Sequence, residues 1–201
     1  MTSSYQWHTT RLAAASCVLL VFVALAPATL AGQRAPSLML VFEAATPDDA
    51  TARDGYQTIW AQEGTRIVAA LRSHTGLEFQ EADNTVHVVV VEEPSSSGFG
   101  SRPMRLRSSY STDTKRATLI HELGHRLQTR FFRRDDEDHP TLFLYLYDVW
   151  VELYGEEFAG EQVAVESRRR GYYDYESAWR EVLSISPEDR AGRVHEVLGS
   201  R

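Results

Sequence analysis

The feature that most constrains this chain of 201 residues is the pentapeptide His121-Glu122-Leu123-Gly124-His125, which lies within a run of helical periodicity. Residues four positions apart lie on the same face of an α-helix, one turn from each other. His121 and His125 can therefore direct their imidazole rings toward one point. Two histidines in this arrangement suit two of the ligands of a tetrahedral zinc ion.

Glu122 follows His121 directly and so lies about 100° further round the helix, by the 3.6-residue period. From there its carboxylate can reach a water molecule at the metal without binding the metal, which is the place of a general base. An apolar stripe runs beside the two histidines and consists of Leu119, Ile120, Leu123 and Leu127. The stripe predicts a half-buried helix and argues against a surface helix that carries the motif by chance.

H-E-x-x-H within such a helix resembles the active-site helix of the zincin group of zinc metallopeptidases, and in particular its gluzincin branch. Leu123-Gly124 is a common filling between the two histidines in that group. The resemblance covers this helix and, more loosely, the order of the elements around it. It implies a compact α+β domain, a bound Zn²⁺ ion and hydrolysis of peptide bonds, with His121 and His125 as metal ligands and Glu122 as the catalytic base.

The third ligand is expected in the next helix, residues 141–154, because zincins without a third histidine complete the site with a glutamate from a second helix. Only Asp148 and Glu152 interrupt this apolar segment with charge, and an unpaired buried carboxylate is costly. If the chain returns antiparallel, the rise of about 1.5 Å per residue brings both level with the histidines. Glu152 is therefore predicted as the third ligand, with Asp148 as partner of a ligand histidine.

Other assignments of these residues stay open. Asp148, Glu157 and His139 are the alternative third ligands, and Asp148 can instead form an ion pair with an arginine of the active-site helix. His139 lies in a charged turn predicted over residues 133–140. It can be a metal ligand, a catalytic histidine or a loop histidine without a role. The aromatic residues 172–175 can supply a tyrosine hydroxyl for a developing oxyanion, or simply pack.

Residues 1–31 differ from the rest of the chain. Arg11 precedes a long uncharged, apolar run that ends in small residues, which predicts a signal peptide cleaved before Gly32. An uncleaved membrane anchor is the alternative, because the run approaches the length that spans a bilayer. The protein is thus expected to be secreted or periplasmic, with one metallopeptidase domain over residues 32–201. Cleavage would remove Cys17, the one cysteine, and leave no disulfide.

The periodicity of the remaining sequence predicts an α+β fold. Apolar and β-branched runs indicate strands at residues 37–42 (buried on both faces), 77–80, 86–91 and 104–108. Apolar residues at helical spacing indicate helices over residues 49–73, 113–133, 141–154, beyond 161 to about 170, 176–184 and 187–198. The expected architecture is a small mixed β-sheet with a long helix, the active-site helix and a helical C-terminal half.

Composition limits the partners. The hydrophobic content of 43% is ordinary for a globular protein with a core, and the net charge of −7 points away from nucleic acid. The expected partner is a peptide or protein substrate, added as a further strand along residues 103–109. Arg105 and Arg107 can equally protect a sheet edge from aggregation. A membrane is expected as a partner only if the N-terminal segment stays uncleaved.

Three other functions remain open at this point. The first is an interaction domain with a non-catalytic zinc ion, which a fourth protein ligand such as His139 would mark because structural zinc sites leave no open position. The second is an amidase that acts on non-peptide material of the cell envelope. The third is a helical, envelope-associated domain without a metal.

Overall fold

The computed structural model describes residues 38–98, 102–132, 135–169 and 173–199. They all belong to one compact unit that runs from Gln33 to Arg201. The predicted signal peptide, residues 1–31, lies outside the described residues. Within the described ranges, no helix combines the length and the apolar character needed to cross a bilayer.

Three strands form the sheet, in the order β1 (Met39–Ala44), β2 (Thr85–Val91) and β3 (Met104–Arg107). All three run parallel, so that Leu40 is aligned with Val86 and Val90 with Leu106. The predicted α+β class is confirmed, although the strands form a parallel sheet and not a mixed one. The strand predicted over residues 77–80 is wrong. This segment has no regular secondary structure.

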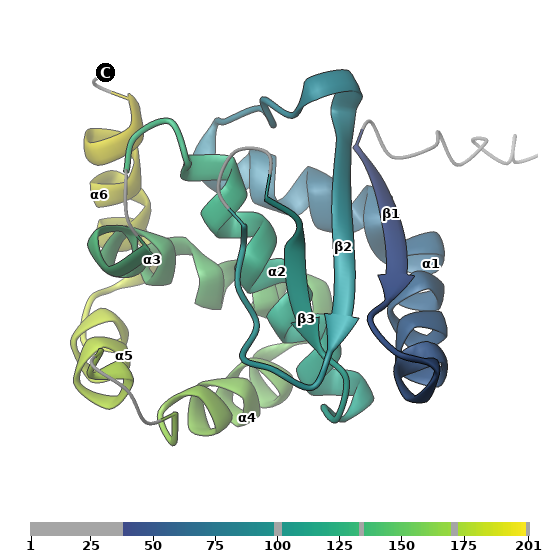
Figure 1. Cartoon of the computed structure of the whole chain (residues 1–201). Helices are drawn as coiled ribbons and strands as arrows, with labels where there is room; N and C mark the ends of the chain where they lie inside the picture. Colours follow the sequence, from purple (N-terminus) through teal and green to yellow (C-terminus); the bar gives the residue numbers. More distant parts are fainter. Residues whose placement is uncertain (1–37, 99–101, 133–134, 170–172, 200–201) are drawn as a thin grey trace, which may run out of the picture. The chain divides into compact units, whose positions relative to one another are not determined.

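β1 lies at an edge of the sheet, and only one of its faces is buried. Leu40 is buried, whereas Met39 beside it is 55% exposed. The prediction of a strand buried on both faces is wrong because the helices of the described ranges cover only one face of the sheet. In Figure 1 the described helices lie behind the sheet, and none of them crosses its front face. A parallel sheet with one open face is uncommon, since such sheets are usually covered on both sides.

α1 (Ala50–Thr75) connects β1 to β2 and packs against both strands. Gly64 lies within it and does not end it, as predicted. The helix ends at Gly76, which has the left-handed φ of 68° that glycine adopts without strain. The amide of Gly76 donates a hydrogen bond of 2.8 Å to the carbonyl of Arg72. The long predicted helix is thus present, with an end that the glycine marks.

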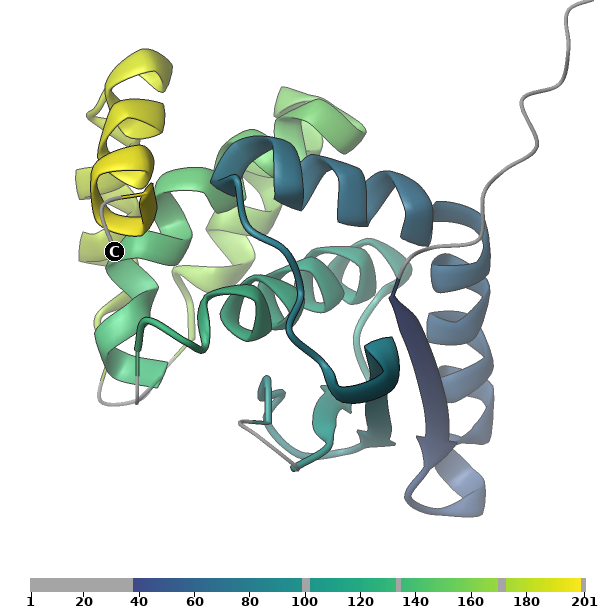
Figure 2. The same ribbon diagram turned by 90° about the horizontal axis from the view of Figure 1, so that it is seen from above.

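The C-terminal half is helical, as predicted, and comprises α2 (Thr112–Gln128), α3 (Asp135–Tyr154), α4 (Glu156–Glu166), α5 (Tyr175–Leu183) and α6 (Pro187–Gly199). Ser111 is the N-cap of α2, and its hydroxyl accepts a hydrogen bond of 3.2 Å from the amide of Thr114. α2 lies behind β3, with α1 on its other side (Figure 2). α3 is central to this half, because it contacts α1, α2, α4, α5 and α6.

α3 begins at Asp135, well before residue 141, where the sequence predicted its start. The proline lies inside the helix, in its second turn, and has no main-chain amide to donate to the carbonyl four residues earlier, so the helix lacks one main-chain hydrogen bond there. The sequence also supplies acidic residues throughout 135–138, a composition that favours a helix N-terminus. The predicted charged turn is therefore largely helical. As a result His139 lies on a helix and not in a loop.

Candidate metal centre

Three histidines from two helices come together in the core. His121 and His125 lie on α2 and His139 on α3, with 1%, 3% and 5% of their surfaces exposed. Their ligand nitrogens all lie within 4.8 Å of one another. Nε2 of His121 is 3.0 Å from Nε2 of His125, close to the separation of roughly 3.3 Å that zinc–nitrogen bonds of about 2.0–2.1 Å give in a tetrahedron. The cluster is therefore compact enough to hold one metal ion.

The donor set narrows the choice of metal without reducing it to one. Imidazole nitrogens suit zinc, copper, iron and nickel. Three protein ligands leave one position of a tetrahedral ion open to water or substrate. His121 and His125, the two histidines predicted as ligands, thus lie with His139 in a group that is able to hold a metal ion.

Glu152, the predicted third ligand, lies elsewhere. Its side chain is 51% exposed, and its carboxylate is 2.9 Å from Nε2 of His74 on α1. Asp148, the predicted partner of a ligand histidine, accepts a hydrogen bond of 2.9 Å from Nε of Arg190 on α6. The predicted roles of both acids assumed that a charge in an apolar helix must face the metal. In the fold, the partners of both acids come from neighbouring helices, His74 from α1 and Arg190 from α6.

A carboxylate that the sequence analysis missed lies behind His121. Oε1 of Glu166, on α4, is 2.8 Å from Nδ1 of His121, and Oε2 accepts a hydrogen bond of 3.1 Å from the indole Nε1 of Trp179. A carboxylate on the far nitrogen of a ligand histidine fixes the ring and raises its basicity. The only sequence signal for this role is the spacing of Glu166 with Ala159 and Gln162 on the buried face of α4.

Glu166 is ionised in this setting. Burial by itself would raise the pKa of its carboxyl group, but the charges of His121 and Arg169 outweigh burial and lower the pKa to about 2. Nη2 of Arg169 lies 3.5 Å from Oε1 of Glu166. A negative charge thus lies directly behind the histidine cluster, where it favours a cation bound on the other side of His121.

Two tyrosines enclose His139. The ring of Tyr173 stacks on the ring of His139 with centroids 4.6 Å apart, and the hydroxyl of Tyr175 is 3.4 Å from Nε2 of His139. Burial is the main cause that raises the pKa of Tyr175 to about 12, and the charges of Glu166 and Glu122 add to it. The hydroxyl of Tyr175 is therefore protonated at neutral pH and able to donate a hydrogen bond.

Glu122 lies on α2 between the two histidines and is 3% exposed. Its charge contributes to raising the pKa of Tyr175, after burial and the charge of Glu166. The structure therefore places the two predicted histidine ligands and a tyrosine of the 172–175 segment in one region, and it buries the predicted base on the helix that carries both histidines.

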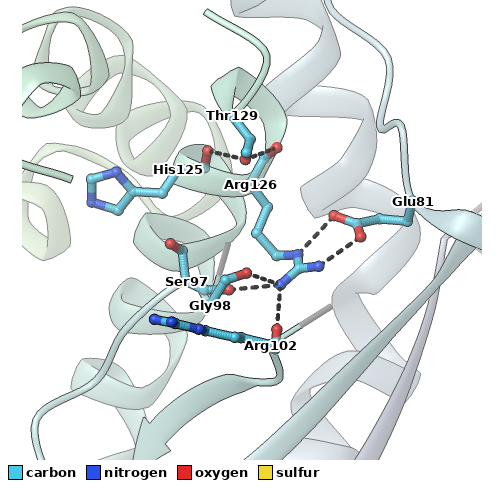
Figure 3. Close-up of polar contacts among 7 residues, drawn as sticks. All are labelled: Glu81, Ser97, Gly98, Arg102, His125, Arg126 and Thr129. Atoms are coloured by element: carbon cyan, nitrogen blue, oxygen red, sulfur yellow. Dashed lines mark hydrogen bonds and ion pairs between the residues drawn. The ribbon is translucent and has the colours of Figure 1, made fainter. Parts of the chain in front are cut away.

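Arg126 follows His125 in sequence, but its side chain points in another direction (Figure 3). Its guanidinium binds both carboxylate oxygens of Glu81, at 2.7 and 2.6 Å. It also donates to the carbonyls of Ser97 at 2.8 Å and Arg102 at 3.3 Å. Arg126 thereby ties the two ends of the segment before β3 to α2, on the side of the helix away from the His125 ring.

The outer edge of β3, where a substrate strand was expected, is already paired. The amide and carbonyl of Arg105 exchange hydrogen bonds of 2.9 and 3.0 Å with Ser96. The amide of Arg107 donates to the hydroxyl of Ser95 at 3.0 Å, and the carbonyl of Arg107 accepts from the hydroxyl of Tyr56 at 2.9 Å. A peptide that adds to this edge has to displace the segment of Ser95 and Ser96.

Gly124 lets α2 and α3 approach closely. A Cβ atom at this position would lie 2.4 Å from Cδ1 of Leu142 and 3.1 Å from the hydroxyl of Tyr145. We expect Gly124→Val to lower the free energy of unfolding by about 1–3 kcal/mol, the usual cost of an overpacked core, as measured by chemical denaturation. Gly160→Val is the matched control, because a Cβ atom there has open space. Equal stability of the two variants would contradict close packing of α2 on α3.

The role of Glu166 predicts a specific defect. Glu166→Gln should weaken zinc binding by about 10–100-fold, the effect typical of losing the partner of a ligand histidine. Competition with a chromophoric chelator measures the affinity. Glu161→Gln, an exposed position on the same helix, is the control and should bind zinc as the unchanged protein does. If Glu166→Gln also binds zinc with unchanged affinity, the carboxylate does not support His121.

Comparison of the chain with models of protein families, with curated proteins and with solved structures gives no match. A function therefore has to be inferred from the chemistry of the histidine cluster and of the groups around it.

Proposed function

We propose that the protein is a zinc-dependent metallopeptidase of the zincin type, in which His121, His125 and His139 hold the metal. The observation that carries the proposal is that three buried imidazoles lie close together. Two of them belong to an H-E-x-x-H motif on α2, which also supplies the glutamate. His139 takes the place that the sequence had suggested for Glu152. Three histidines with one open position are a ligand set of catalytic zinc sites.

The surroundings of the histidines fit a bound cation. A zinc ion held there supplies Lewis-acid chemistry, which polarises a carbonyl group and lowers the pKa of water toward about 7. Glu166 orients His121 through the contact of 2.8 Å at Nδ1. Aromatic rings pack around His139, with Phe143 at 5.5 Å between centroids. Such an apolar wall excludes water and strengthens the electrostatic interactions inside the site.

Glu122 acts as the general base in this proposal. A carboxylate oxygen of Glu122 accepts the proton of the attacking water and then delivers it to the nitrogen of the leaving amine. The protonated hydroxyl of Tyr175 donates a hydrogen bond to the carbonyl oxygen of the substrate as negative charge develops on it. The distance of 3.4 Å from this hydroxyl to Nε2 of His139 supports the assignment.

The proposed substrate is a peptide or protein, met outside the cytoplasm if the N-terminal segment acts as the predicted signal. Binding along residues 103–109 requires Ser95 and Ser96 to leave the edge of β3 first, because they occupy its main-chain groups.

The second candidate is a non-catalytic zinc-binding domain, which the burial of all three histidines favours. In that case the hydroxyl of Tyr175 would serve as a fourth ligand and close the site. Tyr175→Phe separates the two functions. The proposed peptidase should keep its zinc and hydrolyse peptides about 10²-fold more slowly, as after loss of an oxyanion donor, whereas a closed structural site should lose zinc affinity.

Peptide hydrolysis tests the proposal directly. The full chain, loaded with one zinc ion, should cleave members of a degenerate peptide library, with the products identified by mass spectrometry. A chelator should stop the cleavage and added zinc should restore it. Zinc-loaded protein that cleaves no peptide would contradict the proposed peptidase activity.

A further inference from the structure

A groove of about 440 Å³ lies where α3, α5 and α6 meet. Apolar side chains form much of its lining, namely Leu144, Ala178, Val182, Ile185 and Val197. Charged residues also line it, namely Glu181, Arg193 and Glu196, and all three are exposed. An apolar cleft of this size with a few polar groups is typical of a ligand pocket.

The groove adjoins the histidine cluster. Two of its lining residues are Tyr173 and Pro140. Tyr173 stacks on the ring of His139 at 4.6 Å between centroids, and Pro140 follows His139 in the chain. Tyr173 is therefore shared by the groove and the surroundings of the proposed metal site. Because an extended peptide advances about 3.3 Å per residue, a peptide with one bond held at the histidines can pass Tyr173 and place a nearby side chain in the groove.

We propose that this groove is the specificity pocket of the site and that it binds a large apolar side chain of a peptide substrate. The choice of a peptide as occupant rests on the proposed function. The apolar lining and the shared residue Tyr173 support a substrate side chain over a separate partner. Burial of one leucine or phenylalanine side chain should strengthen peptide binding about 10–100-fold over alanine.

The test uses the full chain with Glu122→Gln, loaded with zinc, so that peptides bind without being cleaved. A set of peptides differs only in whether one position carries Leu, Phe, Ala or Asp, and this position is moved along the sequence. Calorimetry gives each Kd. At one position, Leu and Phe should bind about 10–100-fold more tightly than Ala, and Asp should bind no better than Ala.

Substitutions of groove residues then test whether the preference for Leu and Phe arises in the groove. Ala178→Trp fills the groove and should remove the preference for Leu and Phe without changing the zinc stoichiometry. Ala164→Trp carries the same substitution at an exposed position of α4 and should keep the preference. Ile185→Asp places a charge in the groove without adding bulk, and should also remove the preference if Ala178→Trp does not fold.

Several outcomes would overturn the groove assignment. They are a lack of measurable peptide binding, equal binding of all side chains, and a preference that survives both Ala178→Trp and Ile185→Asp. Self-association that these substitutions abolish, without any side-chain preference, would assign the groove to a second copy of the chain. An apolar preference in binding together with no hydrolysis by the zinc-loaded unchanged protein would support the groove and contradict the peptidase.

Discussion

His139→Ala should lose stoichiometric zinc binding, whereas Glu152→Ala should retain one zinc ion per chain. The nitrogens of His139 lie with those of His121 and His125 within 4.8 Å, so its loss removes one of three ligands. The carboxylate of Glu152 instead contacts His74 at 2.9 Å. Loss of a ligand should weaken zinc binding by more than about 100-fold, beyond the effect of losing a partner of a ligand.

The measurement is metal content by elemental analysis after the full chain has been equilibrated with zinc and desalted. Glu152→Ala is the matched control, because it lies on the same helix as His139. His121→Ala should lose zinc as His139→Ala does, and thermal unfolding without metal should show that all variants fold. Zinc retained in His139→Ala but lost in Glu152→Ala would restore the assignment made from the sequence and contradict the cluster of three histidines.

The difference between His125 and His139 shows which part of the site could be predicted. His121 and His125 share one helix, so the spacing of four residues alone places them on one face. His139 reaches them only because α3 begins at Asp135 and packs on α2 through the close contact at Gly124. The charged residues and the proline around His139 are typical of a turn, so the local sequence pattern did not predict that this segment is helical.

The two acids of α3 show the opposite error. The expectation that each is buried and needs a compensating partner fits Asp148, whose side chain is 20% exposed and pairs with Arg190. It does not fit Glu152, whose side chain is 51% exposed. The partners, His74 and Arg190, lie on α1 and α6, far away in sequence. The helices and most strands follow from local periodicity, whereas side-chain partners and the parallel strand direction depend on tertiary packing that no local pattern encodes.

Glu122→Gln should bind zinc as the unchanged protein does and hydrolyse peptides about 10²–10⁴-fold more slowly, the usual contribution of a general base. The substitution keeps the size and shape of a side chain that is 3% exposed, but an amide cannot accept the proton of the attacking water. Because the base acts in the chemical step, kcat should fall with little change in KM.

The pH profile adds a readout that a structural role would not change. A carboxylate base gives kcat/KM an acid limb, since protonation removes the base as the pH falls, and this limb should disappear from the residual activity of Glu122→Gln. Glu161→Gln, exposed on α4, should keep both the rate and the limb. Full activity in zinc-loaded Glu122→Gln would exclude Glu122 as the base. If Glu122 acts only as the base, Glu122→Gln leaves the three histidine ligands intact and zinc binding unchanged. Loss of both zinc and activity in this variant would instead show that Glu122 supports the binding of the metal.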